Sequence, residues 1–185
     1  MLAELCGPVS GTVIDYCAGA GGKTLAIAAV SPNANFIACD TRAKALRQLE
    51  KRARRAGLAA LKLHTFEPEN PLQAQALTVF VDAPCSGLGT LRRHPELRLR
   101  LDAKTLRKVP ALQATILQQA SQHVLPGGRL IYGTCSILQQ ENQDIVQQFL
   151  VQNSNFKTIP ESELSMAPHS HNTDGFYGII LHRTN

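Results

Sequence analysis

The chain has 185 residues, of which 44% are hydrophobic and 18% charged, a balance typical of one globular domain rather than of a disordered chain. It has no run of about 18 apolar residues and no basic-then-apolar leader, so we expect neither a membrane-spanning helix nor a secretory signal. The five cysteines include no Cys-x-x-Cys pair, and we therefore expect no disulfide framework, no zinc site and a reducing, cytoplasmic location.

The net charge of +5 is distributed unevenly along the chain. Residues 42–55 carry seven basic side chains against one glutamate, and residues 92–108 carry seven against two acidic ones, so the rest of the chain is net acidic. Such concentrations of positive charge attract a polyanion such as RNA. For 42–55 a plain solvated helix face explains the charge equally well. For 92–108 we favour phosphate contact, because this stretch follows a loop that carries reactive side chains.

The predicted elements alternate between strands and helices. In chain order we expect a strand at 12–16, a helix after a glycine turn, a strand at 35–40, a basic helix at 42–56, and strands at 59–64 and 78–82. A long loop, a helix at 110–124, a strand at 129–134, a helix at 138–152 and a last strand within 175–183 follow. This alternation predicts an α/β fold, with a mostly parallel sheet covered by helices on both faces.

A glycine turn follows the first strand, at the edge of the sheet where α/β proteins bind ligands. Residues 19–22 let the backbone approach a ligand closely, and the next helix offers free N–H groups. Asp40 ends the second strand and could accept both hydroxyls of a ribose. The glycine spacing fits neither the dinucleotide fingerprint nor a P-loop. S-adenosylmethionine fits better, with Asp15, Lys23 and the turn around its methionine end. A tight turn between strand and helix that binds no ligand would have a similar sequence.

Two cysteines follow neighbouring strands. Cys85 and Cys135 come after the fourth and fifth strands, so we expect both sulfurs at the same edge of the sheet as the glycine turn. A single free cysteine is usually a buried apolar side chain, as we expect for Cys39. A thiolate added to C6 of cytosine makes C5 nucleophilic toward a methyl sulfonium, and an acid such as Asp82 can take up the charge on the ring. The residues alone do not decide which cysteine attacks.

Long blocks of the sequence resemble the RsmB/Sun/Nop-type RNA cytosine-5 methyltransferases. The resemblance extends from Val13 nearly to Arg183, and it is carried by DYCAGAGGKT, VDAPCSGLGTLRRHPELRLR, LQATILQQASQHVLPGGRLIYGTCSILQQEN and TDGFYGIILHR. It implies a Rossmann-like class I fold that uses S-adenosylmethionine. It also implies that Cys135 is the nucleophile, that Cys85 helps to release the product, and that Asp82 lies against both cofactor and cytosine.

The resemblance implies further contacts at the glycine turn, at the strand ends and in the arginine-rich loop. The cofactor would be held by Cys17, Ala18, Gly19, Ala20, Gly21, Gly22, Lys23, Asp40 and Asp82. Thr65 or Glu67 would replace the aspartate with which the family often holds adenine after its third strand. RNA phosphates would be bound by Arg92, Arg93, Arg98 and Arg100, and no metal ion is expected.

Two departures from the family pattern affect the expected organisation. The turn reads A-G-A-G-G-K where the family usually reads A-A-P-G-G-K, which loosens it, and only 14 residues precede Asp15. We therefore expect residues 1–185 to form one catalytic domain without the N-terminal RNA-recruiting region of the family. The predicted function is methyl transfer to cytosine C5 in RNA, with ribosomal RNA favoured. Transfer RNA, a cofactor- and RNA-binding module with little turnover, and a less favoured DNA methyltransferase remain as alternatives.

Overall fold

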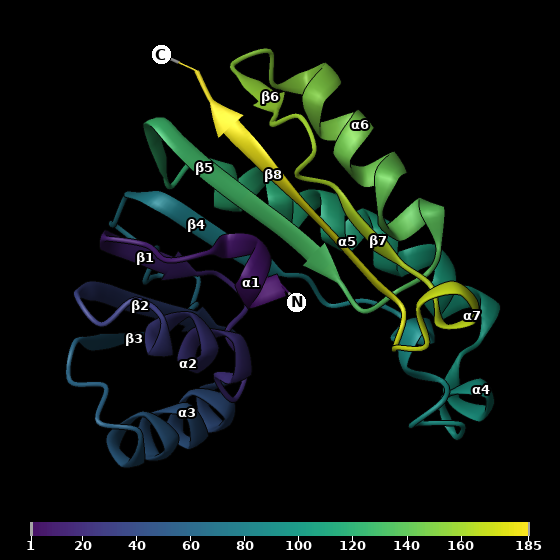
Figure 1. Ribbon diagram of the computed structural model, residues 1–185, viewed down its shortest axis with the longest axis horizontal. Helices are drawn as coiled ribbons and strands as arrows, with labels where there is room; N and C mark the ends of the chain where they lie inside the picture. Colours follow the sequence, from purple (N-terminus) through teal and green to yellow (C-terminus); the bar gives the residue numbers. More distant parts are fainter. Residues whose placement is uncertain (1, 185) are drawn as a thin grey trace.

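An eight-stranded β-sheet carries the fold (Figure 1). The computed structural model describes the backbone of residues 2–184 and the side chains of these residues other than Leu2 and Arg100. The strand order is β3-β2-β1-β4-β5-β8-β6, and β7 pairs with β8 outside this path. The strands are β1 (Gly11–Asp15), β2 (Ala34–Asp40), β3 (Leu61–Thr65), β4 (Ala76–Asp82), β5 (Val124–Thr134), β6 (Phe156–Thr158), β7 (Leu164–Met166) and β8 (Phe176–Arg183).

The helices of the chain lie before and between the strands. They are α1 (Leu2–Cys6), α2 (Gly22–Ala29), α3 (Ala43–Arg55), α4 (Leu97–Arg100), α5 (Ala103–Ser121), α6 (Gln143–Gln152) and α7 (Pro168–His171), with short 3-10 turns at Leu88–Thr90 and Gln139–Glu141. Strands β1 to β5 pair in parallel, whereas β8 runs antiparallel to β5, β6 and β7. This confirms the predicted Rossmann-like α/β fold, and the direction of strand addition reverses between β1 and β4.

Both faces of the sheet are buried, which explains why its central strands are almost continuous runs of apolar residues. Successive side chains along a strand point to opposite faces. Ile14 and Val79 pack on the side of α5 and α6, whereas their neighbours Val13 and Phe80 pack on the side of α1 and α2. Figure 1 shows α1, α2 and α3 on one side of the sheet and α5 and α6 on the other. The carboxyl ends of the parallel strands remain available for a site.

The helix predicted to begin at Pro110 begins seven residues earlier, at Ala103. Proline is favoured in the first turn of a helix, which is why the sequence indicates a start there. The stronger signal is Asp102, whose carboxylate accepts a hydrogen bond from the Thr105 N–H at 2.6 Å and caps the helix. Pro110 lies inside α5, and much of the loop predicted after β4 is therefore helical.

Two other boundaries also differ from the prediction. β5 begins at Val124 rather than at residue 129, because Val124 pairs with Ala76 before the register shifts at the Pro-Gly-Gly segment. α6 begins at Gln143 rather than at residue 138, because the preceding residues form a 3-10 turn. The short elements α1, α4, α7, β6 and β7 had no prediction of their own, since three to five residues are too few to show a period.

Within residues 2–184, no helix is both long and apolar enough to cross a membrane. In the same range, no group of three or more His, Cys, Asp or Glu side chains is arranged to hold a metal ion. The five cysteines, all of which lie in this range, are free.

Candidate active site

The carboxyl ends of β1, β4 and β5 bring the predicted reactive side chains to one edge of the sheet. Asp82 pairs in register with Gly133, and the Ala83 N–H donates to the Gly133 carbonyl at 2.9 Å. On the other side of β4, the Tyr16 N–H donates to the Phe80 carbonyl at 2.8 Å. These bonds align the strand ends, so the loops that carry the two predicted cysteines leave the sheet side by side.

The sulfur atoms of Cys85 and Cys135 are 3.2 Å apart, although the residues are separated by 50 positions in the chain. The pKa of Cys135 is lowered, first because its sulfur accepts a hydrogen bond from Cys85 and further because of the nearby Lys23 charge. The pKa of Cys85 is raised by the same hydrogen bond and by burial. Cys135 is therefore the more acidic thiol of the pair, and Cys85 is the one that keeps its proton more firmly.

Lys23 and Asp82 form an ion pair next to the thiols, with Nζ and Oδ2 2.6 Å apart. Burial acts to lower the pKa of Lys23, but the Asp82 carboxylate more than offsets this effect, and the net shift is upward. Burial raises the pKa of Asp82, and Lys23 offsets only part of that rise. Both side chains remain partly exposed, at 38% for Lys23 and 24% for Asp82, so a substrate can reach them.

A buried polar network lies under the two cysteine loops, and sequence reasoning assigned it no role. Glu141 is fully buried, and its Oε2 accepts a hydrogen bond from the Ser86 N–H at 2.8 Å. Asn142 donates from Nδ2 to the Ser136 carbonyl at 3.0 Å and accepts from the Thr134 hydroxyl at 2.6 Å. These bonds fix Ser86 and Ser136, the residues that directly follow the two cysteines. The sequence signal that could have pointed to this network is the Glu-Asn pair that ends the third block resembling the family.

The glycine turn is shaped by its contact with α3. Gly21 has φ of +80°, a conformation that side chains with a Cβ rarely adopt, and an added Cβ would lie 2.0 Å from Cδ1 of Leu49. The Gly21 N–H donates to the Ala18 carbonyl at 2.9 Å, and Arg52 of α3 donates from Nη1 to the Ala20 carbonyl at 2.6 Å. The loosened turn is thus held against α3 at the start of α2.

Asp40 lies beside this turn, as expected for a ribose-binding carboxylate at the end of β2. Its oxygens accept hydrogen bonds from the Gly19 N–H and the Arg42 N–H, both at 2.8 Å, and from the Arg42 guanidinium at 2.9 and 3.0 Å. Burial acts to raise the pKa of Asp40, but these donors lower it overall. The Arg42 side chain is 70% exposed and can move, so a ribose would share or replace its hydrogen bonds.

Asp15 supplies the observation that tests the fit of S-adenosylmethionine. Its Oδ2 accepts a hydrogen bond from the Thr24 hydroxyl at 2.6 Å, while its buried Oδ1 has no hydrogen-bond partner among the described residues. Such an oxygen is suited to an ammonium group, which the methionine end of the cofactor carries. The residues around the turn therefore fit the predicted cofactor.

The stability of the chain is expected to depend on pH through Asp15. Burial raises the pKa of Asp15 from 3.8 to about 7. The folded state therefore binds a proton that the unfolded state releases, and this contribution is present below pH 3.8 and is lost as the pH rises to about 7. Urea unfolding between pH 4 and 8 should show a smaller loss of stability for Asp15→Asn than for the parent. The control Glu69→Gln, in an exposed loop, should follow the parent, and three parallel curves would contradict the assignment.

The other predicted cofactor residues lie at the same edge but show fewer specific contacts. Cys17 is half-buried behind the turn, and burial raises the pKa of its thiol. Thr65 ends β3, and Glu67 is exposed in the following loop. Phe66, between them, packs on Tyr16 with ring centroids 4.7 Å apart. An adenine contact for Thr65 or Glu67 stays a prediction.

The arginine-rich loop after Cys85 is tied to the site by two links. The Gly89 N–H donates to the Cys135 carbonyl at 3.0 Å, and the Gly175 N–H donates to the Gly89 carbonyl at 2.7 Å. Arg93 forms an ion pair with Asp174, its Nε lying 2.6 Å from Oδ2, so the structure gives this arginine a positioning contact within the chain. The remaining predicted phosphate ligands are Arg92 and Arg98, which are exposed, and Arg100, whose side chain lies outside the described residues.

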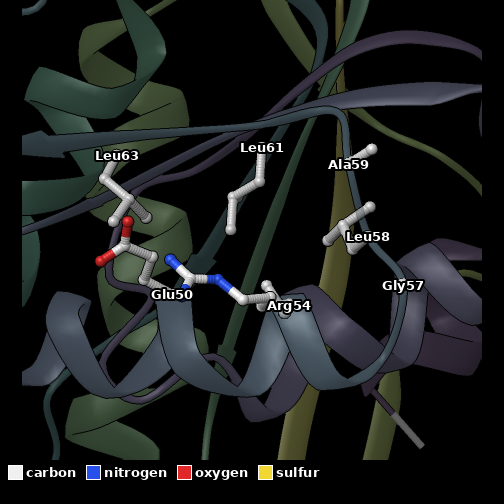
Figure 2. A pocket seen from close by; sticks show the side chains of 8 residues that line it. Glu50, Arg54, Gly57, Leu58, Ala59, Leu61 and Leu63 are labelled. Atoms are coloured by element: carbon white, nitrogen blue, oxygen red, sulfur yellow. The ribbon is translucent and has the colours of Figure 1, made fainter.

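Two cavities of about 370 Å³ each lie on the side of α2 and α3. One borders the site, since it is lined by Gly22, Lys23 and Asp174 among others. The other lies between α3 and the edge strand β3, and Figure 2 shows Glu50 extending from the helix toward Leu63 and Arg54 lying along the helix toward Glu50. No predicted site residue lines the second cavity.

The chain matches the family described as 16S rRNA methyltransferase RsmB/F over residues 8–182. It is 33% identical over 176 residues to the ribosomal RNA small subunit methyltransferase B of Shewanella oneidensis, covering 89% of this chain and 41% of that protein. The crystal structure of PH0851 superimposes with a TM-score of 0.91 at 32% identity, covering 98% of this chain and 45% of that one. NSun6 from Pyrococcus horikoshii, crystallised with SFG, gives a TM-score of 0.85 at 26% identity, covering 100% and 51%. The chain thus spans about half or less of the length of these relatives.

Proposed function

The chain belongs to the 16S rRNA methyltransferase RsmB/F family, and we propose that its domain transfers a methyl group from S-adenosylmethionine to C5 of a cytosine in RNA. Ribosomal RNA is the favoured substrate, because the curated relative acts on the small ribosomal subunit RNA according to its name. The observation that carries the proposal is the pair of thiols 3.2 Å apart beside the Lys23–Asp82 ion pair. The free cysteines favour the reducing cytoplasm as the location.

S-adenosylmethionine is the cofactor, as predicted from the sequence, because the family consists of methyltransferases and the NSun6 relative was crystallised with SFG. In this chain the Asp15 carboxylate, Lys23 and the glycine turn would hold its methionine end, and Asp40 its ribose. When bound, the cofactor supplies an electrophilic methyl group at a sulfonium centre.

Cys135 starts the proposed reaction as a thiolate. Its sulfur forms a bond to C6 of a cytosine that has been flipped out of its stack, which breaks the C5–C6 π bond and leaves an enamine whose C5 is nucleophilic. Negative charge moves onto the ring toward N3 and O2. Lys23 supplies a hydrogen-bonding cation for this charge, and Asp82, its ion-pair partner, is the acidic group beside the base.

Cys85 acts at the end of the reaction. After C5 has been methylated, the C5 proton passes to a water molecule, the C5–H electron pair re-forms the C5–C6 double bond, and the C6–S bond breaks, which restores the aromatic ring. The electron pair of the broken bond returns to Cys135 as a thiolate. The Cys85 thiol, 3.2 Å away, stabilises this leaving group by a hydrogen bond. The buried bond from Ser86 to Glu141 keeps Cys85 in this place.

The proposal is tested by incubating the 185-residue chain with tritiated S-adenosylmethionine and unmethylated 16S ribosomal RNA, and then analysing the nucleosides. Tritium is expected in 5-methylcytidine. If only transfer RNA were labelled, transfer RNA and not ribosomal RNA would be the substrate. If only duplex DNA were labelled, the substrate would be DNA and not RNA. Cofactor binding by calorimetry without transfer to any of them would favour a binding module. Label at a position other than C5 would disprove the covalent mechanism.

A further inference from the structure

A row of exposed cations covers the outer face of α3, and the proposed reaction does not use it. The buried face of this helix consists of Leu46, Leu49 and Ala53. At 100° per residue, positions 44, 47, 51 and 55 fall on the opposite side. We call these side chains the α3 cation row: Lys44, Arg47, Lys51 and Arg55, all of which are exposed.

The remaining charges of this helix are directed elsewhere. Arg42 binds the Asp40 carboxylate, and Arg52 binds the Ala20 carbonyl in the cofactor turn. Figure 2 shows that Glu50 and Arg54 are directed toward one another along the cavity between α3 and β3. The α3 cation row therefore contains no acid, and its members form no ion pair with the described residues. Neighbours three or four positions apart repel one another, and this repulsion is relieved when an anion binds.

The position of the row limits the kind of partner it can bind. It extends over about 16 Å, and it begins four residues after Asp40, near the catalytic edge. The apolar side of α3 is buried in the protein, so the helix has no apolar face to insert into a lipid surface. Repeated cations along a helix match the repeated phosphates of a nucleic acid backbone.

We propose that the α3 cation row binds backbone phosphates of the RNA substrate outside the reaction site. This inference rests on the proposed function for the identity of the nucleic acid. The sequence allowed residues 42–55 to be either a polyanion-binding surface or a plain solvated helix face, and the inference chooses the first. Of the seven cations, Arg42 and Arg52 contact the cofactor site, Arg54 lines the cavity, and the four of the α3 cation row form the RNA-binding surface.

The test compares a row variant, Lys44→Gln with Arg47→Gln, Lys51→Gln and Arg55→Gln, with the parent chain. Filter binding to a labelled 16S ribosomal RNA fragment is measured between 50 and 300 mM KCl, settings chosen so that salt-dependent binding is visible. We expect affinity to fall by about tenfold or more, and the salt slope to decrease by about 0.7 for each phosphate that the variant no longer neutralises. Cofactor affinity and thermal stability should not decrease.

Two lysine pairs provide a matched control for net charge. Lys44→Gln with Lys51→Gln removes two charges from the row, and Lys62→Gln with Lys157→Gln removes two from exposed positions on β3 and β6. The row pair should weaken RNA binding and raise the KM for RNA with kcat unchanged, while the control pair stays within about twofold of the parent. Equal effects of the two pairs would overturn the inference.

The outcomes separate this inference from the proposed function. If the chain binds RNA through the row but does not methylate cytosine, the proposed function fails and the inference stands. If it methylates cytosine and the row variant keeps the RNA affinity of the parent, the inference alone fails. Failure of the parent chain to bind RNA would overturn the inference as well.

Discussion

Replacing Cys135 by alanine is expected to reduce methyl transfer to RNA by a factor on the order of 10³ or more. Cys135 is the thiol of lowered pKa, and it follows the carboxyl end of β5, beside the Lys23–Asp82 pair. Without its sulfur no bond to C6 can form, and C5 of an intact cytosine is a poor nucleophile. Binding of S-adenosylmethionine should change little, because Cys135 is not among the predicted cofactor residues.

The measurement is single-turnover transfer of tritiated methyl groups, with cofactor affinity determined separately by calorimetry. Cys6→Ala is a suitable control, because Cys6 is buried in α1 away from the loops that carry Cys85 and Cys135. The control should transfer methyl groups at the rate of the parent. If Cys135→Ala did so as well, Cys135 would not be the nucleophile, and Cys85 would be the remaining thiol in position to attack.

Replacing Cys85 by alanine is expected to trap a covalent protein–RNA complex that survives denaturing gel electrophoresis. Cys135 can still attack, but the hydrogen-bond donor 3.2 Å from its sulfur is missing when the C6–S bond must break. Release then becomes slower than attack, and the adduct accumulates. The measurement is the fraction of labelled RNA that migrates with the protein after denaturation, followed over time with S-adenosylmethionine present.

Two further variants identify the physical cause of trapping. Cys85→Ala combined with Cys135→Ala should form no adduct, because the attacking sulfur is absent. Cys85→Ser keeps a hydroxyl donor near Cys135 and should trap less RNA than Cys85→Ala. Equal trapping by serine and alanine would show that Cys85 assists release by some means other than hydrogen bonding. Free turnover of both single variants would remove the release role altogether.

The strands can be located from the sequence to within a few residues because burial on both faces makes them nearly continuous apolar runs. β2 and β4 are located in this way. The predicted start of α5 is wrong because it gives Pro110 more weight than the capping residue Asp102. Capping is a hydrogen bond between neighbours in the chain, so this boundary is predictable in principle. The start of β5 is not, since the pairing of Val124 with Ala76 depends on how β4 and β5 align.

The sequence by itself determined which residues meet at the carboxyl ends of the strands, because parallel strands that alternate with helices end at the same side of a sheet. The order of its strands and helices was enough to bring Cys85, Cys135 and the glycine turn together. Only the tertiary structure decided the contacts around them: the ion pair of Lys23 with Asp82, the bond from Ser86 to Glu141 and the charged α3 side chains that stay exposed. These contacts join residues tens of positions apart, and such pairings depend on the packing of loops and helices, which carries no local signal in the chain.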